Sequence, residues 1–375
     1  MKITLLRSLL IFSFLCGIAP LELSAQEKET LRVLSWEGYV NAEDLSAVNQ
    51  LLEEQGYPYE VKVITPLAEG AEQMFNLIRS GHADITFLTL FFIKMENEQT
   101  SKILQAINID SPRLSNYKHL LTNLTHIPMG LAKHQGLSSQ GRPLYIPWGG
   151  GIYGFYANHN RIDKSEVPKS IKELWLPKWH KRFSLNKSQS WYNVGLALMN
   201  LEKSPFYLHE LVKNSQRDLI ISTMSANSAL QKQLNSLYAN AGDLWGATPK
   251  FSPELAIVSS WGPEITRKNR SGGNWQLINF EEGHMVWLDT INFVKGLEGK
   301  KLEAAEIFAN YFIGEKVQSR VAKDLSMVAA SSLAQENGEL GNATTLFNDK
   351  MFVPPYDGIS YSIIKRMTDI ALTHH

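Results

Sequence analysis

Three side chains that could recognise an organic cation follow the first apolar strand pattern of the chain. The segment 31–39 reads Leu-Arg-Val-Leu-Ser-Trp-Glu-Gly-Tyr and ends in Trp36, Glu37 and Tyr39. Side chains at the end of such a strand in an α/β protein face the crevice where ligands bind. An aromatic face attracts a cation, and a carboxylate beside it pairs with the charge. The pattern therefore predicts a cation site, although a core tryptophan beside solvent-facing neighbours would leave the same pattern.

The pairing of tryptophan with a carboxylate recurs later in the chain. Trp287 and Asp289 lie two positions apart in a strand pattern, so they project to the same side. Trp261 directly follows another strand pattern at 255–259. Glu37 is a weaker candidate, because its side chain points away from Trp36 if the first strand continues through both residues.

Motifs for catalysis, nucleotides and metals are absent or out of context. The string Gly149-x-Gly151-x-x-Gly154 matches the dinucleotide fingerprint, but strand-like residues follow it where a helix N-terminus would have to hold the pyrophosphate. No histidine spacing suits a metal, and no G-x-S-x-G elbow is present. We predict a binding protein that is not an enzyme and uses no metal or cofactor. The alternative is a secreted hydrolase with Glu37 and Asp289 as paired carboxylates, which would need a separation of about 5–5.5 or 6.5–9.5 Å.

The first 25 residues predict a cleaved signal peptide and export to the periplasm. Lys2 and Arg7 precede an apolar run at 8–15, and Ala25 supplies the small residue that signal peptidase needs. The only cysteine, Cys16, lies in this signal, so the mature chain would contain no disulfide or thiol chemistry. The chain balances 37 basic against 37 acidic residues, which gives no electrostatic footprint for nucleic acid or an anionic membrane.

Strand and helix patterns alternate along the chain, which predicts an α/β fold with an open, mostly parallel sheet. Asn41 can cap a first helix, with Asp44 placed to complete the cap, and Gly81 can end a second helix. Strand patterns at 60–64 and 83–88 flank that second helix.

Two segments are suited to connect separate lobes. The glycines at 149–151 allow the chain to turn or cross between bodies, and the strand pattern at 285–294 is long enough to cross back. We therefore predict two discontinuous lobes with a ligand cleft between them, formed by residues 27–150 with 290–330 and by residues 151–289 with 331–375.

Several segments together carry a family resemblance over nearly the whole mature chain. They are Ser35-Trp-Glu-Gly-Tyr-Val40, Ala83-Asp-Ile85 with Lys94-Met95, Ile146-Pro-Trp-Gly149, Ser170-Ile-Lys-Glu-Leu-Trp175, Trp261 and Trp287-Leu-Asp289. This combination resembles the periplasmic spermidine/putrescine-binding proteins, which are two-lobed (type II) solute receptors. The resemblance implies that aromatic residues box a methylene chain in the cleft while acids hold ammonium groups. The matching cleft residues are Trp36, Tyr39, Trp261, Trp287 and Asp289.

The chain departs from the family pattern at several cleft positions. Gln189 and Tyr192 stand where members usually have two further acids, and Phe91 replaces a pocket tyrosine. Tyr356 and Asp357 offer a further anion near the C-terminus. Each lost charge-assisted hydrogen bond would weaken binding by about 1.5–3 kcal/mol. The resemblance thus implies a cationic amine as the ligand class and leaves its length and its binding register open.

The resemblance implies a monomeric protein that closes on spermidine, norspermidine or putrescine. Such a protein delivers its ligand to an inner-membrane ABC permease. Alternatively it reports the ligand to a membrane-bound cyclic-di-GMP signalling receptor, as the similar norspermidine-sensing proteins do. The mature sequence leaves both partners open.

Overall fold

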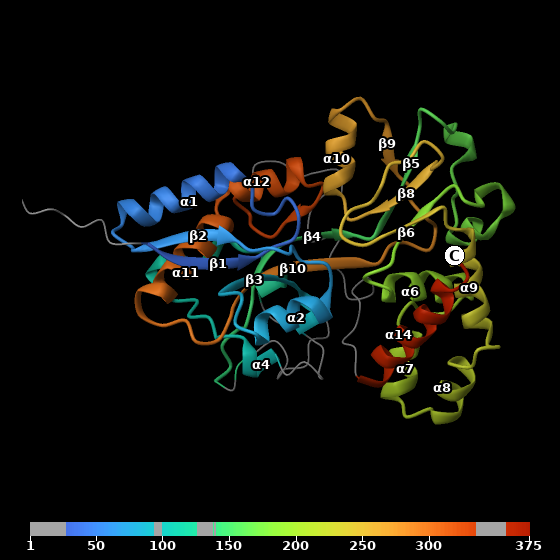
Figure 1. The fold of residues 1–375 in the computed structure, drawn as a ribbon, viewed down its shortest axis with the longest axis horizontal. Coiled ribbons are helices and arrows are strands. Elements are labelled where there is room, and N and C mark those ends of the chain that lie inside the picture. The colour runs from blue at the N-terminus through green and yellow to red at the C-terminus, as the bar shows by residue number, and fades with distance from the viewer. Residues whose placement is uncertain (1–27, 94–99, 126–137, 139, 335–357) are drawn as a thin grey trace, which may run out of the picture.

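The computed structural model describes residues 28–93, 100–125, 138, 140–334 and 358–375. Two bodies, each made of strands and helices, lie side by side (Figure 1). The predicted α/β fold with two lobes is confirmed. The predicted signal at 1–25 lies outside the described residues, and among the helices described none is long and apolar enough to cross a membrane.

The first body is built on one six-stranded sheet. Its order from edge to edge is β11 (Val328–Ala329), β4 (Ile146–Ile152), β10 (Val286–Phe293), β3 (Ile85–Thr89), β1 (Glu29–Leu34) and β2 (Tyr59–Val63). β1 pairs in parallel with β2 and β3, but β10 runs antiparallel to both β3 and β4, and β11 runs antiparallel to β4. The expectation of mostly parallel pairing is wrong, because β10 enters from the second body and therefore runs in the opposite direction.

Helices complete the first body. The first of them begins as predicted, because Asn41 Oδ1 accepts a hydrogen bond from the Asp44 amide at 2.7 Å. The Asp44 carboxylate does not complete the cap but pairs with Arg320 at 2.6 Å. The second ends at Arg79 with Ser80 as its C-cap, directly before Gly81 in the left-handed region (φ 71°). The helices of this body are α1 (Ala42–Glu54), α2 (Ala71–Arg79), α3 (Leu90–Ile93), α4 (Thr100–Ile103), α5 (Thr122–Thr125), α11 (Gly299–Phe312) and α12 (Glu315–Asp324), with 3-10 turns at Pro112–Leu114 and Tyr117–His119.

The second body contains two smaller sheets, which are ordered β8-β5-β9 and β6-β7. Their strands are β5 (Gly154–Asn158), β6 (Ser184–Asn186), β7 (Asp243–Trp245), β8 (Ile257–Ser260) and β9 (Trp275–Leu277). The surrounding helices are α6 (Trp191–Asn200), α7 (Tyr207–Lys213), α8 (Arg217–Thr223), α9 (Ala229–Asn240), α10 (Pro263–Arg270) and α14 (Gly358–Leu372), with 3-10 turns at Lys164–Glu166, Ile171–Trp175 and Pro177–Trp179.

The glycine run at 149–151 has a different role from the predicted one. All three glycines lie inside strand β4, so the expected turn there is wrong. A Cβ atom on Gly149 would lie 2.9 Å from Val321 Cγ1 and 3.0 Å from Met327 Cε, which is closer than packed carbon atoms normally approach. Glycine is therefore required for α12 and the segment after it to pack on the sheet. The chain then passes to the second body between β4 and β5.

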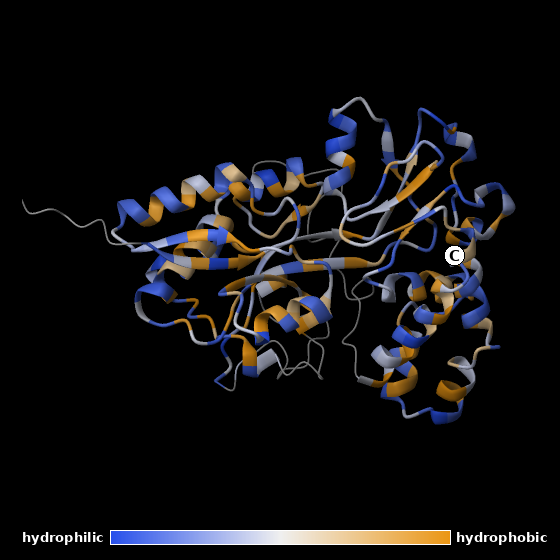
Figure 2. Cartoon of the chain, viewed as in Figure 1, coloured by the Kyte–Doolittle hydropathy of each residue, from blue (hydrophilic) through white to orange (hydrophobic). Residues whose placement is uncertain are grey.

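Contacts between elements bear on where the lobes divide. α11 packs against α1 and β1, whereas α14 packs against α9, α6 and α7. The helices present hydrophobic faces to these contacts: Figure 2 shows hydrophobic and hydrophilic positions alternating along helices such as α1, whose Val48 and Leu52 are fully buried.

The strand β10 belongs to the first sheet, because it pairs there from Val286 onward. The exact lobe boundaries remain a prediction.

Candidate functional site

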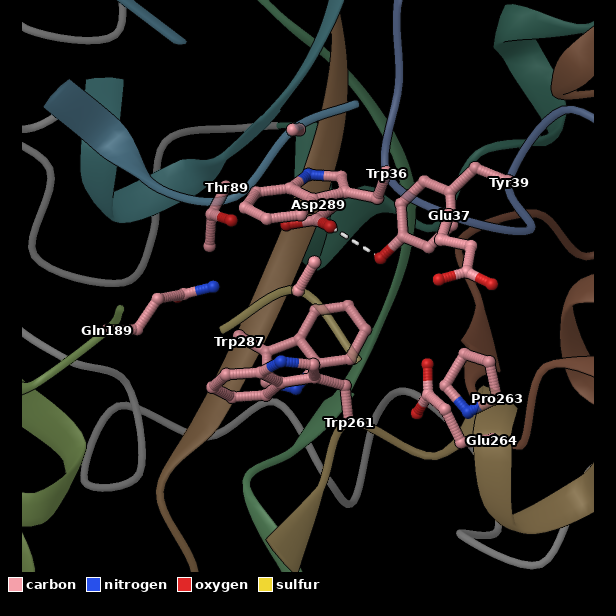
Figure 3. Close-up of a pocket in the computed structure, with 12 residues that line it drawn as sticks. Trp36, Glu37, Tyr39, Thr89, Gln189, Trp261, Pro263, Glu264, Trp287 and Asp289 are labelled. Carbon is pink, nitrogen blue, oxygen red and sulfur yellow. Dashed lines mark hydrogen bonds between the residues drawn. The ribbon is translucent and has the colours of Figure 1, made fainter. Parts of the chain in front are cut away.

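A pocket lies where the two bodies meet, beside β10, and both bodies contribute side chains to it (Figure 3). It brings together the predicted residues Trp36, Glu37, Tyr39, Gln189, Trp261, Trp287 and Asp289. Residues that the sequence analysis did not propose complete its lining, namely Ala68, Thr89, Ala247, Pro263 and Glu264.

The turn after β1 places Trp36 and Glu37 in the same pocket. β1 ends at Leu34, and a turn follows in which Gly38 adopts a left-handed conformation (φ 79°). Because the strand does not continue, the alternation that would direct Glu37 away from Trp36 does not apply. The indole Nε1 of Trp36 donates a hydrogen bond to the carbonyl of Phe87 at 2.8 Å, which holds the ring in place.

Asp289 is the most buried acid of the pocket, with 3 % of its surface exposed. Tyr39 donates its hydroxyl proton to Asp289 Oδ2 at 2.6 Å. Asp289 Oδ1 has no hydrogen-bond partner among the described residues, and no described lysine or arginine forms an ion pair with this carboxyl. Burial raises the pKa of Asp289 to about 7, while the hydroxyls of Thr89 and Tyr39 act in the opposite direction. The site therefore holds a carboxyl group that lacks a counter-charge.

Aromatic residues hold the tryptophan wall on the second-body side. The Trp261 ring lies 4.9 Å from Tyr153 and 5.1 Å from Tyr192, measured between ring centroids. The rings of Trp261 and Trp287 are nearly perpendicular, with centroids 6.4 Å apart. Such edge-to-face packing leaves little freedom to either indole.

Tyr192 and Phe91 do not line the pocket, contrary to the expectation from the sequence. Tyr192 is fully buried behind Trp261, and burial raises its pKa well above the ordinary value, with Asp289 adding to the effect. Phe91, in α3 of the first body, packs against Tyr192 with the ring centroids 6.1 Å apart. Tyr192 therefore supports the Trp261 ring, and Phe91 contacts Tyr192 from the first body. The other two predicted residues, Tyr356 and Asp357, lie outside the described residues.

Glu264 is an acid of the pocket that sequence reasoning missed. It lies in the first turn of α10, has 7 % of its surface exposed, and accepts a hydrogen bond from Ser260 Oγ at 2.8 Å. Burial raises its pKa. A signal was present, because the sequence Trp261-Gly-Pro-Glu264 is a typical helix start that places an acid one turn from a strand-end tryptophan.

One arginine lies between the two acids at this side of the pocket. Arg267 Nη1 is 3.1 Å from Glu37 Oε1, and Arg267 Nη2 is 3.7 Å from Glu264 Oε1. Glu37 belongs to the first body and Arg267 to α10 of the second, so this ion pair connects the bodies across the pocket.

The pocket can bind but offers little room in this arrangement. Its volume is about 40 Å³, while an ordered water needs about 10–15 Å³, so it has room for only a few waters. No group of three potential metal ligands occurs among the residues that the structure describes. Aromatic faces around buried carboxylates suit a small organic cation, and a larger solute would require the bodies to move apart.

The fold and this interlobe pocket define a receptor for a small solute. The family model of the bacterial extracellular solute-binding proteins matches residues 73–350. The chain therefore belongs to this family. Comparison with curated protein sequences gives no match.

Three solved structures illustrate the similarity. A putative spermidine/putrescine ABC transporter protein from Listeria monocytogenes has a TM-score of 0.67 at 12 % identity, with 93 % of this chain and 100 % of that chain covered. The spermidine/putrescine substrate-binding protein PotD from Streptococcus pneumoniae has a TM-score of 0.62 at 15 % identity, with 92 % and 99 % covered. The periplasmic binding protein AfuA from Actinobacillus pleuropneumoniae, solved with fructose-6-phosphate, has a TM-score of 0.58 at 15 % identity, with 92 % and 98 % covered. The resemblance seen in the sequence is thus confirmed at the level of family and fold, while the fold alone is compatible with different ligands.

Proposed function

We propose that this protein is a periplasmic receptor for a linear polyamine of the spermidine, norspermidine or putrescine class. The observation that carries the proposal is Asp289, a buried carboxyl group without a basic partner among the described residues. It lines a pocket shared with Trp36, Trp261 and Trp287. A negative sugar phosphate would meet this carboxyl unfavourably, whereas an ammonium group would satisfy it.

The energies involved support a cationic amine. A buried polar atom that lacks a partner costs about 1–3 kcal/mol, and a charge-assisted hydrogen bond contributes about 1.5–3 kcal/mol. A desolvated cation over an aromatic face gains about 2 kcal/mol or more. An ammonium at Asp289 would remove the cost at Oδ1 by forming this charge-assisted hydrogen bond, and it would also gain the aromatic contribution. The methylene groups of the ligand would lie against the tryptophan faces.

We propose further that the mature protein passes its ligand to a membrane protein. An inner-membrane ABC permease is one partner, and a membrane-bound cyclic-di-GMP signalling receptor is the other. The structural similarity to proteins of spermidine/putrescine transporters favours the permease. Co-purification with each membrane protein in the presence of ligand would distinguish the two.

Calorimetric titration of the purified mature protein tests the ligand class. We expect saturable heat with at least one of putrescine, spermidine and norspermidine. Glutamate, glycine and fructose-6-phosphate should give none. The Asp289→Asn variant, shown to be folded by circular dichroism, should bind at least about tenfold more weakly. Binding of an acidic or neutral solute with no heat from any amine would contradict the proposal.

A further inference from the structure

The pocket is chemically asymmetric. Figure 3 shows Gln189 at one side and Glu37 with Glu264 at the other, while Asp289 and the tryptophans lie between them. Arg267 reaches both Glu37 and Glu264, so these two acids form one cluster. One side of the pocket is thus acidic and the opposite side is neutral.

Hydrogen bonds hold the backbone at Gln189 in a fixed position on the neutral side of the pocket. Its backbone amide donates a hydrogen bond to Asn186 Oδ1 at 2.7 Å, and Asn186 Nδ2 donates to the carbonyl of Gly246 at 2.7 Å. Only 6 % of the Gln189 surface is exposed. Its side chain extends toward the pocket (Figure 3) and has no hydrogen-bond partner among the described residues.

A side-chain amide that faces the pocket without a protein partner indicates which ligand group belongs beside it. The glutamine side chain offers both a carbonyl acceptor and an amide donor. An ammonium group at this side would be desolvated without a counter-charge, which is unfavourable. A neutral amide on the ligand can donate to and accept from Gln189 at once, and it carries no charge that burial would penalise.

We propose that the ligand is an asymmetric amine with an ammonium group at Asp289 and a neutral hydrogen-bonding group, such as an N-acyl amide, at Gln189. The inference rests on the proposed function, because it assigns the ligand class within the same pocket. Gln189 is then the residue that selects a singly acylated amine over one with free ammonium groups at both ends.

The test compares matched pairs of ligands by calorimetry on the wild-type mature protein. N-acetylputrescine is titrated beside putrescine, and the two monoacetylated spermidines beside spermidine. We expect the acetylated member of at least one pair to bind about tenfold or more tightly than its parent. Equal or tighter binding of both unmodified amines would overturn the inference and leave the proposed function intact. Absence of binding by all of them would overturn both.

Variants of Gln189 assign the preference to this side chain. Gln189→Glu supplies a counter-charge of nearly the same size, so it should reverse the preference toward the unmodified amine. Gln189→Leu removes the hydrogen bonds and should reduce the preference for the acetylated ligand to within about threefold. If both variants keep the wild-type preference for the acetylated ligand, the neutral group of the ligand binds elsewhere.

Discussion

At the residue scale, the buried Asp289 carboxyl that would bind a cation also lowers the stability of the folded protein when it is ionised. Burial raises its folded-state pKa to about 7, from an ordinary value of 3.8. Between about pH 4 and 7 the folded protein therefore holds this proton more tightly than the unfolded chain does. The resulting stability is present in full below about pH 4 and is lost as the pH rises through 7.

The first prediction follows for the ligand-free protein. Asp289→Asn removes the titration and keeps a side chain that can still accept the Tyr39 hydroxyl. At pH 8 we expect it to unfold at a higher temperature than wild type, with a free energy of unfolding larger by a few kcal/mol at most. The difference should be smaller at pH 5. Thermal unfolding followed by circular dichroism measures this. Asp110→Asn, at an exposed turn, is the control and should leave the midpoint unchanged.

The same carboxyl makes binding depend on pH. A cation binds the ionised form, so its affinity should rise with pH up to about 7 and then level off. At pH 6, binding should release a proton from Asp289. Calorimetry at that pH in two buffers with different ionisation enthalpies should therefore give different apparent heats. Equal heats in wild type would show that binding releases no proton, and an unchanged difference in Asp289→Asn would show that another group titrates.

Trp261 provides an aromatic wall that its neighbours hold in place. Trp261→Ala removes the face over which the ligand lies, and we expect a loss in affinity of about tenfold or more. Trp261→Phe retains a ring and should lose only a few-fold. Trp36→Ala should lose less than Trp261→Ala, because Tyr39 also lines that side. Calorimetry measures all three after their folding is checked, and an unaffected Trp261→Ala would exclude this wall from the site.

At the element scale, α10 sets the charge at the pocket's acidic side. The helix supplies Glu264 and also Arg267, which pairs with Glu37 from the turn after β1. About half of the Arg267 side chain is exposed, so this pair is a weak surface interaction. A protein cation nevertheless occupies a position that a ligand ammonium would otherwise use.

Removing that cation gives the next prediction. Arg267→Met keeps the bulk and frees both acids, so polyamine affinity should rise about two- to fivefold, with a larger gain at low salt. Lys268→Met is the matched control, because Lys268 lies over the Phe251 ring and not at the pocket. Titration at two salt concentrations measures both variants. Weaker binding by Arg267→Met would mean that the ion pair closes the pocket over its ligand.

At the scale of the whole molecule, the small cavity implies movement of the two bodies. Ion pairs cross between them at Arg267 with Glu37, at Arg270 with Asp324 and at Lys365 with Glu72. These are exposed pairs, which contribute about 0–1 kcal/mol each. The ion pairs alone therefore offer little resistance to separation of the bodies, as in hinge closure. The buried rings of Phe91 and Trp191 also meet across the bodies, with centroids 5.0 Å apart, so opening must either separate this contact or pivot about it.

Small-angle scattering tests this movement directly. The radius of gyration of the mature protein should decrease when a saturating amine is added. Asp289→Asn at the same amine concentration should show a smaller decrease, because it binds the amine more weakly. A wild-type radius that does not change on saturation would contradict closure and would require another entry route.

The sequence by itself determined the features that depend on local pattern. Periodicity and capping residues were sufficient to predict the helix that begins after Asn41 and the one that ends before Gly81. Alternation within one strand was sufficient to place Trp287 and Asp289 on the same side. The α/β class followed from the order of such segments.

Only the tertiary structure decided which side chains share the pocket and at what depth. Tyr192 is buried against Trp261, and Phe91 packs on Tyr192, because α3 of the first body and α6 of the second meet only in the folded chain. Glu264 lines the pocket because β8 and α10 of the second body pack against elements far away in the chain. The direction of β10 and the extended conformation of the glycines at 149–151 likewise depend on pairing between distant strands. Local sequence cannot determine these features, because they follow from packing and pairing across two bodies, whose energies depend on the partners and not on the segment itself.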